Sequence, residues 1–202
     1  MELNERVGRR LRELREDRGL SLSALARRSG TGKATLSELE AGRRNPTLET
    51  LYALTTALGV SLSAALTDPR AAAGAAGDGG GPGGPGGAAG AGGHAGISGA
   101  AVTAVLTERH EHGGAVTDVF RIRIRAGARQ ESAAHIPGTR EHLVVLAGTA
   151  VVGDPAQPLT AGPGEHAHWA ADAPHFYSAP HGDVEAVLFV RSPREPGPAA
   201  HA

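Results

Sequence analysis

The chain of 202 residues contains no cysteine. Without thiols it can form neither a disulfide framework nor a thiolate metal site, which excludes disulfide-stapled folds and cysteine-based zinc modules. It also lacks an apolar run long enough to span a bilayer and an apolar signal segment near its start. We therefore expect a cytoplasmic protein that has no membrane partner.

Net charge is also nearly absent, at -1 with 20 Lys and Arg against 21 Asp and Glu. Such an average would by itself argue against a nucleic-acid partner. The charges are unevenly divided, however: residues 1–70 carry 12 basic against 9 acidic groups, and residues 101–202 carry 8 against 11. The basic excess lies in the N-terminal part, so the overall charge does not exclude nucleic-acid binding by that part.

Residues 71–96, AAAGAAGDGGGPGGPGGAAGAGGHAG, have almost no apolar bulk. Such a segment cannot offset the entropy lost on ordering, so we predict a flexible linker, placed at residues 68–99. A flexible coil fixes neither the distance nor the orientation of what it joins. The sequence thus predicts two domains, at residues 3–67 and 100–192, with a disordered tail at 193–202.

The segment SLSALARRSGTGKATLSELEAGRRNP, residues 21–46, reads as two short amphipathic helices joined by a glycine-bearing turn. Ser21 is placed to cap the first helix and Gly30 to end it. In the second helix Leu36 and Leu39 share an inward face, and the helix is followed by a pair of arginines. This is the construction of a helix-turn-helix with a positive loop suited to duplex DNA.

The flanking residues predict three further helices. Asn4 is placed to cap a first helix that Gly19 closes, and Thr47 to cap a fourth that runs to Gly59. Ser61 then begins a short fifth helix. The N-terminal part is therefore expected to be an all-α bundle of five helices.

Over residues 3–67 the chain resembles the lambda-repressor-like, or XRE-type, helix-turn-helix domain, through LRELREDRGLSLSALA and GKATLSELEAGRRNPTLETLYALTTALGVSL. The resemblance implies a transcriptional regulator that binds double-stranded operator DNA. It places the DNA contacts at Lys33, Ala34, Thr35, Ser37, Glu38, Arg43 and Arg44. Two departures are Gly32, where Ser or Thr usually caps the recognition helix, and Ala41, where a polar phosphate contact is common.

The same resemblance implies that Arg15 and Glu40 form a partly buried ion pair that ties the first helix to the end of the recognition helix. These two residues are therefore assigned a structural role. An ordinary solvated face remains the alternative for Lys33, Arg43 and Arg44.

After residue 97 the apolar period changes from helical to alternating. In residues 116–125 Phe120, Ile122 and Ile124 alternate with three arginines, which predicts a strand with one buried face. Further strands are predicted at 101–107, 142–146, 149–152, 166–169 and 184–190, separated by Gly- and Pro-containing turns such as 113–114. Many short strands at this spacing indicate a sandwich or barrel.

The stretches AGARQESAAHIPGTREHLVVLAGTAVVG and LTAGPGEHAHWAADAPHFYSAP resemble the two sequence motifs of the cupin fold, an all-β, double-stranded β-helix or jelly-roll-like barrel. Cupins often hold one divalent metal with three His and one Glu. Carried over, the resemblance implies His135, Glu141 and His175, while Ala133 stands at the position of the first His. Two imidazoles and a carboxylate could hold Fe, Mn, Ni or Zn with open positions.

The alternative is a site without metal, in which His135 and Glu141 line a pocket for an organic ligand and His175 hydrogen-bonds a neighbouring strand. The effector pocket is assigned to Phe120, His135, Glu141 and His175. Gln130 is near enough in sequence to be a substitute ligand. The remaining cupin-part histidines are assigned to the surface: His110, His112, His142, His166, His168 and His181.

Two function classes follow from these patterns. The first is a transcriptional regulator, not an enzyme, whose cupin domain senses a small-molecule effector and forms a homodimer. The second is a metal-dependent cupin enzyme, a dioxygenase or isomerase, with an appended DNA-binding domain. The missing first histidine favours the regulator, because sensing needs only a shaped cavity whereas catalysis needs a defined constellation. A repressor or antitoxin with a merely structural second domain is a third interpretation.

Overall fold

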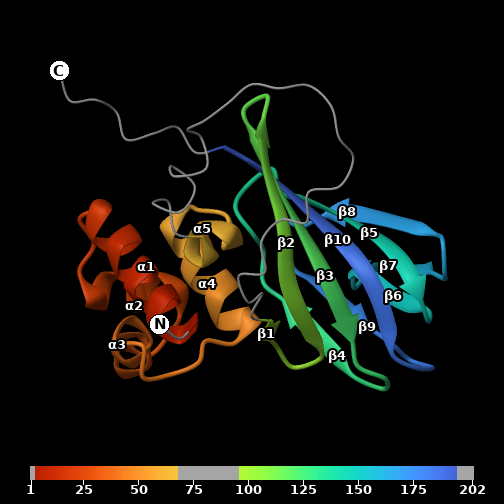
Figure 1. The fold of residues 1–202 in the computed structure, drawn as a ribbon, viewed down its shortest axis with the longest axis horizontal. Helices are drawn as coiled ribbons and strands as arrows, with labels where there is room; N and C mark the ends of the chain where they lie inside the picture. The colour runs from red at the N-terminus through yellow and green to blue at the C-terminus, as the bar shows by residue number, and fades with distance from the viewer. Residues whose placement is uncertain (1–2, 68–95, 195–202) are drawn as a thin grey trace, which may run out of the picture.

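The computed structural model describes residues 3–67 and 96–194. The first range is helical and the second is a β-barrel, and the two lie against each other (Figure 1). Most of the expected linker, 68–99, and of the expected tail, 193–202, lies outside the described residues.

The helical part consists of α1 (Leu3–Asp17), α2 (Leu22–Ser29), α3 (Lys33–Glu40), α4 (Leu48–Leu58) and α5 (Leu62–Leu66). The caps predicted at Ser21, Gly30, Thr47 and Gly59 are confirmed. Ser21 and Thr47 each accept a hydrogen bond from the backbone N–H three residues on. Gly30 and Gly59 end α2 and α4 in the left-handed conformation, with φ of 67° and 72°.

The expected cap at Asn4 is wrong, because α1 already begins at Leu3. Leu3 packs partly buried against the core, and this contact supports two more residues of helix than the capping pattern predicts. Further along α1, a side chain at Gly8 would bring a Cβ to 2.1 Å from the carbonyl oxygen of Leu39. The absence of a side chain there lets α1 approach the end of α3 closely.

The barrel contains ten strands among the described residues: β1 (Ile97–Ser98), β2 (Val102–His112), β3 (Ala115–Ile124), β4 (Arg129–Ser132), β5 (Arg140–Ala147), β6 (Ala150–Asp154), β7 (Gln157–Ala161), β8 (His166–Ala170), β9 (His175–Ser178) and β10 (Val184–Pro193). They form a six-stranded sheet in the order β1-β2-β3-β10-β5-β8 and a four-stranded sheet in the order β4-β9-β6-β7. The pairings within both sheets are antiparallel. This is the all-β cupin barrel that the sequence predicts.

The alternation predicted for residues 116–125 is confirmed in β3. Phe120, Ile122 and Ile124 are buried at 1% exposure or less, while the arginines between them face solvent. The β2–β3 hairpin turns at Gly113 and Gly114, whose φ values of 59° and 74° suit the tight turn that matches strand twist.

Four strands, β1, β4, β7 and β9, were not anticipated, because none shows a usable alternation. Four of the five β7 residues are exposed, and Pro158 is tolerated because β7 is the last strand of its sheet. In β9 three consecutive residues are buried, so its sequence carries no period of two. The positions of these strands are set by pairing with neighbouring strands more than by an alternation of apolar and polar residues in their own sequences.

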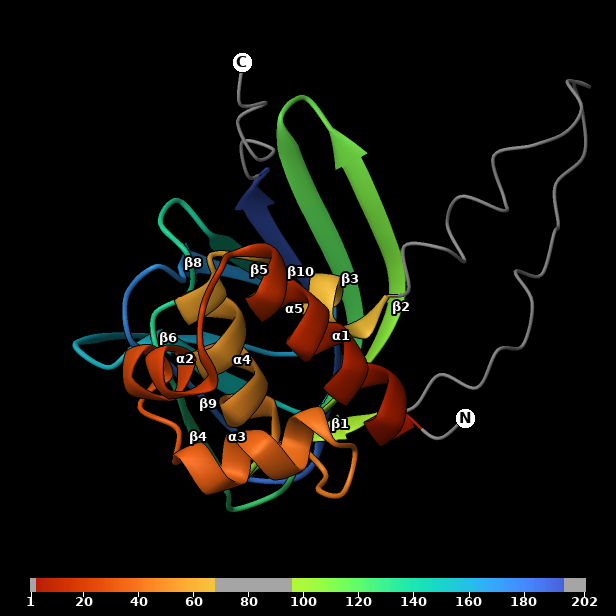
Figure 2. The ribbon, with the colours of Figure 1, turned by 90° about the vertical axis from the view of Figure 1, so that its left-hand side faces the viewer.

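The two parts share one apolar cluster that contains leucines of the helices and aliphatic residues of both sheets. Figures 1 and 2 show α4 and α5 on the side of the helical part that faces the barrel. Among the residues described, no helix has the length and apolar character needed to cross a membrane.

Candidate functional site

The recognition helix α3 is sharply two-sided. Leu36 and Leu39 are buried at 0% and 2% exposure, and they fix which face of the helix looks inward. The predicted DNA contacts Lys33, Ala34, Ser37 and Glu38 are exposed, and Thr35 is half-buried. The structure thus places the predicted base-reading residues together on one accessible face.

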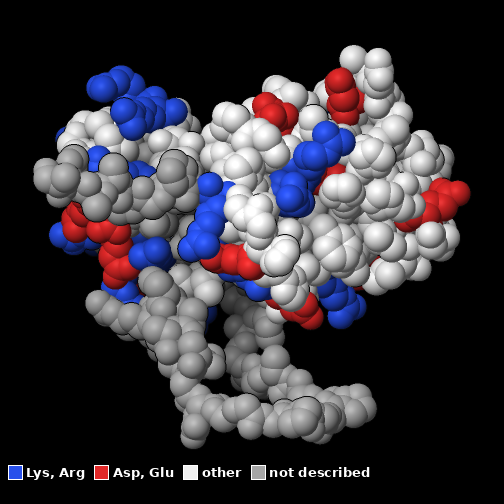
Figure 3. All heavy atoms as spheres, turned by 90° about the horizontal axis from the view of Figure 1, so that it is seen from above, with Lys and Arg blue, Asp and Glu red and all other residues white. Residues whose placement is uncertain are grey.

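The loop after α3 carries two exposed arginines, Arg43 and Arg44. Arg44 Nη1 lies 3.8 Å from Glu38 Oε2, and both side chains are at least half exposed. A pair of this length in water is weak, so it leaves the guanidinium available to a phosphate. Basic side chains also occur over the barrel, where acidic groups accompany them (Figure 3).

Arg15 and Glu40 lie where the resemblance implied. Arg15 Nε and Nη2 donate to the two carboxylate oxygens of Glu40 at 2.7 and 2.8 Å, and Nη1 donates to the carbonyl of Leu20 at 2.8 Å. The side chains are 10% and 7% exposed. The hydrogen bond to Glu40 raises the pKa of Arg15. This bidentate pair joins α1 to the last residue of α3.

Inside the barrel the structure brings together His135, Glu141 and His175, with one ligand atom of each within 4.8 Å of the others. His135 follows β4, Glu141 lies on β5 and His175 begins β9, so both sheets contribute. His135 Nε2 donates to Glu141 Oε1 at 2.9 Å, and His175 Nε2 is 3.4 Å from Glu141 Oε2. All three residues are buried, at 6%, 0% and 1% exposure. We call this set the buried triad.

The arrangement of the buried triad suits a cation. Burial alone would raise the pKa of Glu141, but the hydrogen bond from His135 and the charges of the two imidazoles outweigh it and hold that pKa below its usual value. Burial lowers the pKa of His175. His175 Nδ1 donates to the carbonyl of Ala173 at 2.9 Å, while its Nε2 is buried without a hydrogen-bond partner in the described part. A carboxylate beside an imidazole whose Nδ1 is held by a backbone carbonyl and whose Nε2 has no hydrogen-bond partner is an arrangement that can bind a metal.

Other candidate residues lie apart from the buried triad. Phe120 lies on the inner face of β3 and pairs with Leu188 of the neighbouring strand β10. Leu188 pairs in turn with Leu143 of β5, which is two residues beyond Glu141. The Gln130 side chain accepts hydrogen bonds from the backbone N–H groups of Ala101 and Val102 at 3.1 and 3.0 Å. It therefore secures the start of β2 rather than serving as a ligand. Ala133 is exposed.

The aromatic residues around the buried triad were not predicted from the sequence. The Tyr177 hydroxyl donates to Glu141 Oε2, and the Trp169 ring centroid lies 6.1 Å from that of His175. From the helical part, the Tyr52 ring stacks on His135 with centroids 4.0 Å apart and planes at 18°. Only 3% of the chain is aromatic, so the rarity of these residues was the one available signal.

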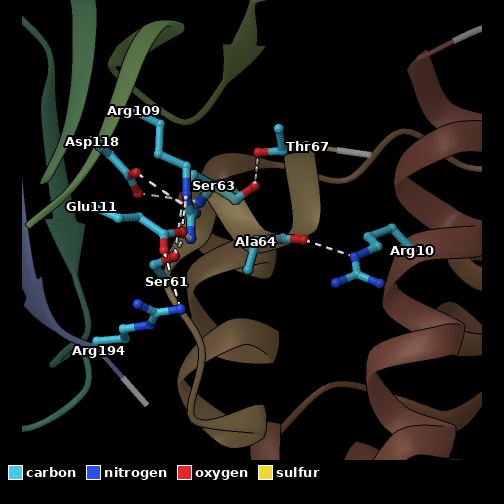
Figure 4. A network of polar contacts seen from close by, with 9 residues as sticks. All are labelled: Arg10, Ser61, Ser63, Ala64, Thr67, Arg109, Glu111, Asp118 and Arg194. Atoms are coloured by element: carbon cyan, nitrogen blue, oxygen red, sulfur yellow. Dashed lines mark hydrogen bonds and ion pairs between the residues drawn. The ribbon is translucent and has the colours of Figure 1, made fainter. Parts of the chain in front are cut away.

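A second set of contacts joins α5 to the barrel (Figure 4). Arg109 of β2 donates to the hydroxyls of Ser61 and Ser63 and lies 3.8 Å from Asp118 Oδ1. Asp118 Oδ2 accepts the backbone N–H of Ser63 at 3.4 Å, in the first turn of α5, where Ser61 makes no side-chain cap. A carboxylate of the barrel thus replaces the missing cap of a helix in the other part.

Comparisons with known proteins agree with this architecture. Residues 11–64 match the helix-turn-helix family HTH_3. The chain is structurally similar to an HTH_3 family transcriptional regulator from Vibrio cholerae, with 26% identity and a TM-score of 0.70 over 95% of this chain and 98% of that chain. It is also similar to the Cupin_2 domain of an XRE family transcriptional regulator from Enterobacter cloacae, with 30% identity over 39% of this chain and 83% of that chain and a TM-score of 0.37.

Among curated proteins, the HTH-type transcriptional regulator SutR of Escherichia coli (strain K12) is 30% identical to the chain over 168 residues, which is 83% of either protein. A match of this extent must include residues of both the helical part and the barrel. The chain belongs to the XRE-type helix-turn-helix family of transcriptional regulators, and its second part has the two-sheet, all-β barrel architecture expected of a cupin.

Proposed function

We propose that this regulator binds operator DNA as a cytoplasmic homodimer, and that its barrel senses a small-molecule effector at the buried triad without being an enzyme. The observation that carries the DNA-binding part is the exposed polar face of α3 beside the arginine loop. The observation that carries the sensing part is a polar, aromatic-walled site in the interior of the barrel.

In this proposal α3 enters the major groove. Lys33 and Glu38 offer a donor and an acceptor to base edges, and Ala34 offers an apolar contact to a thymine methyl group. Arg43 and Arg44 neutralise phosphates and position the helix without reading sequence. A second copy supplies the other recognition helix, because helix-turn-helix proteins read two half-sites about 34 Å apart.

The buried triad fits one divalent cation. His175 fits best, since its Nδ1 is fixed by Ala173 and its Nε2 is free. His135 and Glu141 complete a set of two imidazoles and one carboxylate, which suits Fe, Mn, Ni or Zn. When bound, such an ion supplies a Lewis-acid centre that can hold an effector. The residues of the chain hold and orient that centre and exclude water from it.

Metal analysis of the purified protein tests this part of the proposal. We expect about one divalent ion per chain. His175→Ala should lose most of it, whereas His168→Ala should keep it, because His168 is exposed on the outer face of β8. Equal metal content in the two variants would remove the buried triad as the site.

A metal-dependent cupin enzyme is the second candidate. The specific observation in its favour is the buried triad itself, because two His and one carboxylate with open positions are the ligand set of many oxygen-using iron enzymes. Oxygen consumption by the iron-loaded protein with candidate organic acids discriminates between the two. Turnover abolished by Glu141→Gln would favour the enzyme, and ligand-dependent operator affinity without turnover would favour the regulator.

A further inference from the structure

Helix α4 has a second face that is turned toward the barrel. Glu49, Tyr52 and Thr56 follow one another at the spacing of one helical face and all contact the barrel. Glu49 Oε1 accepts the backbone N–H of Ala100 at 2.7 Å, and Thr56 Oγ1 donates to the carbonyl of Ala134 at 3.4 Å. Between them, Tyr52 stacks on His135. The helix that follows the DNA-contacting loop therefore lies directly on a member of the buried triad.

Tyr52 covers the buried triad on the side of the helical part. Its ring is 7% exposed and parallel to the His135 ring at stacking distance. The three triad residues are themselves at most 6% exposed, with their ligand atoms within 4.8 Å of one another. These atoms are close enough together to surround one cation. The Tyr52 ring occupies the face of His135 on the side of the helical part, so a ligand that approaches from that side must displace the ring.

We propose that Tyr52 is a ligand-site residue supplied by the DNA-binding part, and that an organic ligand binding at the buried triad displaces it. The inference rests on the proposed sensing role of that site. Because Tyr52 belongs to α4, its displacement changes the contact between α4 and the barrel. Ligand binding and docking of the helical part then oppose each other, and by linkage each weakens the other by the same factor.

The surroundings also indicate the class of ligand. One carboxylate against the two charges of a divalent ion leaves a net positive charge, which favours an anionic oxygen donor. Three aromatic side chains, Tyr52, Trp169 and Tyr177, lie around the buried triad. They favour a ligand whose remaining part, beyond the oxygen donor, is apolar or planar. A small organic acid meets both conditions.

The contacts of α5 provide a way to loosen docking without touching the buried triad or Tyr52. Arg109 holds Ser61 and Ser63 from the barrel side (Figure 4). The Arg109 side chain is 24% exposed. Arg109→Ala should therefore raise the frequency with which the helical part leaves the barrel. Arg121→Ala is its matched control, because Arg121 is 69% exposed on the outer face of β3.

The first experiment measures access to His135 in the full-length chain with diethyl pyrocarbonate, read by peptide mass spectrometry. Tyr52→Ala should speed modification of His135 by about tenfold or more, and Arg109→Ala should speed it by a smaller factor. Tyr52→Phe, which keeps the stacked ring, and Arg121→Ala should match the wild type. The exposed His166 and His168 serve as internal references that react equally in all variants.

The second experiment uses Co²⁺ as the probe and Trp169, the only tryptophan of the chain, as the reporter. Co²⁺ at the buried triad should quench Trp169 fluorescence, and removal by EDTA should be faster in Tyr52→Ala than in Tyr52→Phe. If Co²⁺ quenches in no variant, the metal site of the proposed function is wrong, and access to His135 still decides the role of Tyr52. Equal His135 rates in Tyr52→Ala and Tyr52→Phe overturn the inference. Should Tyr52→Ala fail to fold by circular dichroism, a His135 rate in Arg109→Ala equal to that in Arg121→Ala overturns it instead.

Discussion

Among single residues, the pair of Arg15 and Glu40 is the interaction whose loss we expect to cost most in the helical part. Glu40→Ala leaves a guanidinium that is 10% exposed without its carboxylate, and such a change costs about 3–5 kcal/mol of unfolding free energy. Denaturant unfolding of the full-length chain measures it. Glu16→Ala is the control, because Glu16 is half exposed and its removal should change stability little. A loss below about 1 kcal/mol in Glu40→Ala would mean that solvent screens the pair.

Asp118 gives a prediction about pH. Burial raises the pKa of Asp118 in the folded protein, more than the hydrogen bond from Ser63 and the charge of Arg109 lower it. A raised folded-state pKa means that this group favours folding when protonated, and that the contribution is lost as pH rises from the unfolded-state pKa through the folded-state pKa. Asp118→Asn should therefore be at least as stable as the wild type at neutral pH, with the difference shrinking in acid. The prediction is contradicted if the stability of Asp118→Asn relative to wild type is lower at neutral pH than in acid.

At the scale of elements, α3 and the loop after it should respond differently to mutation. Glu38→Ala should relax base preference at one operator position at a cost of about 1–3 kcal/mol, whereas Arg43→Ala or Arg44→Ala should weaken binding to all sequences and flatten the salt dependence by about one charge. Because Arg44 lies 3.8 Å from Glu38, Glu38→Ala also frees a cation for phosphate. Titrations of matched and mismatched operators at several salt concentrations check both. Unchanged affinity and specificity in all three variants would refute the docking geometry.

Local signals explain how much of the elements could be predicted from the sequence. The caps at Ser21, Gly30 and Thr47 and the alternation in β3 depend on a few adjacent residues, and the structure confirms them. The cap at Asn4 failed because a tertiary contact of Leu3 lengthens α1. Strands such as β9 were missed because burial on both sides removes the alternation.

The candidate site was predicted to a similar extent. The cupin resemblance pointed to His135, Glu141 and His175, and the structure brings them together. It could not point to Tyr52, because no local pattern relates α4 to the loop after β4: the neighbouring contact of Thr56 with Ala134 joins residues 78 positions apart. Contacts between two separately patterned parts depend on their docking, which the sequence of either part does not determine.

In the whole molecule, docking of the helices on the barrel changes what is required of the segment that connects the two parts. Contacts at α4 and α5 already join the helical part to the barrel, so coupling does not require a rigid connection. The sequence predicts a flexible tether between positions 79 and 93, a range outside the described residues, and effective concentration depends weakly on the length of such a tether. Deleting about ten residues there should therefore change operator affinity by less than about tenfold. Binding titrations with the barrel intact test this. A collapse of affinity would show that the segment is an ordered coupling element.

Footprinting of the 202-residue chain on the DNA that flanks its own gene tests DNA binding by α3 and its loop, since such regulators often act on neighbouring operons. We expect two protected half-sites on one face of the duplex, about 10 base pairs apart from centre to centre. Protection should be lost at moderate salt in the Arg43→Ala, Arg44→Ala double variant and kept in Arg121→Ala. Absence of a protected site, or equal protection with the two variants, would contradict the assignment of α3 and its loop as the DNA-binding surface.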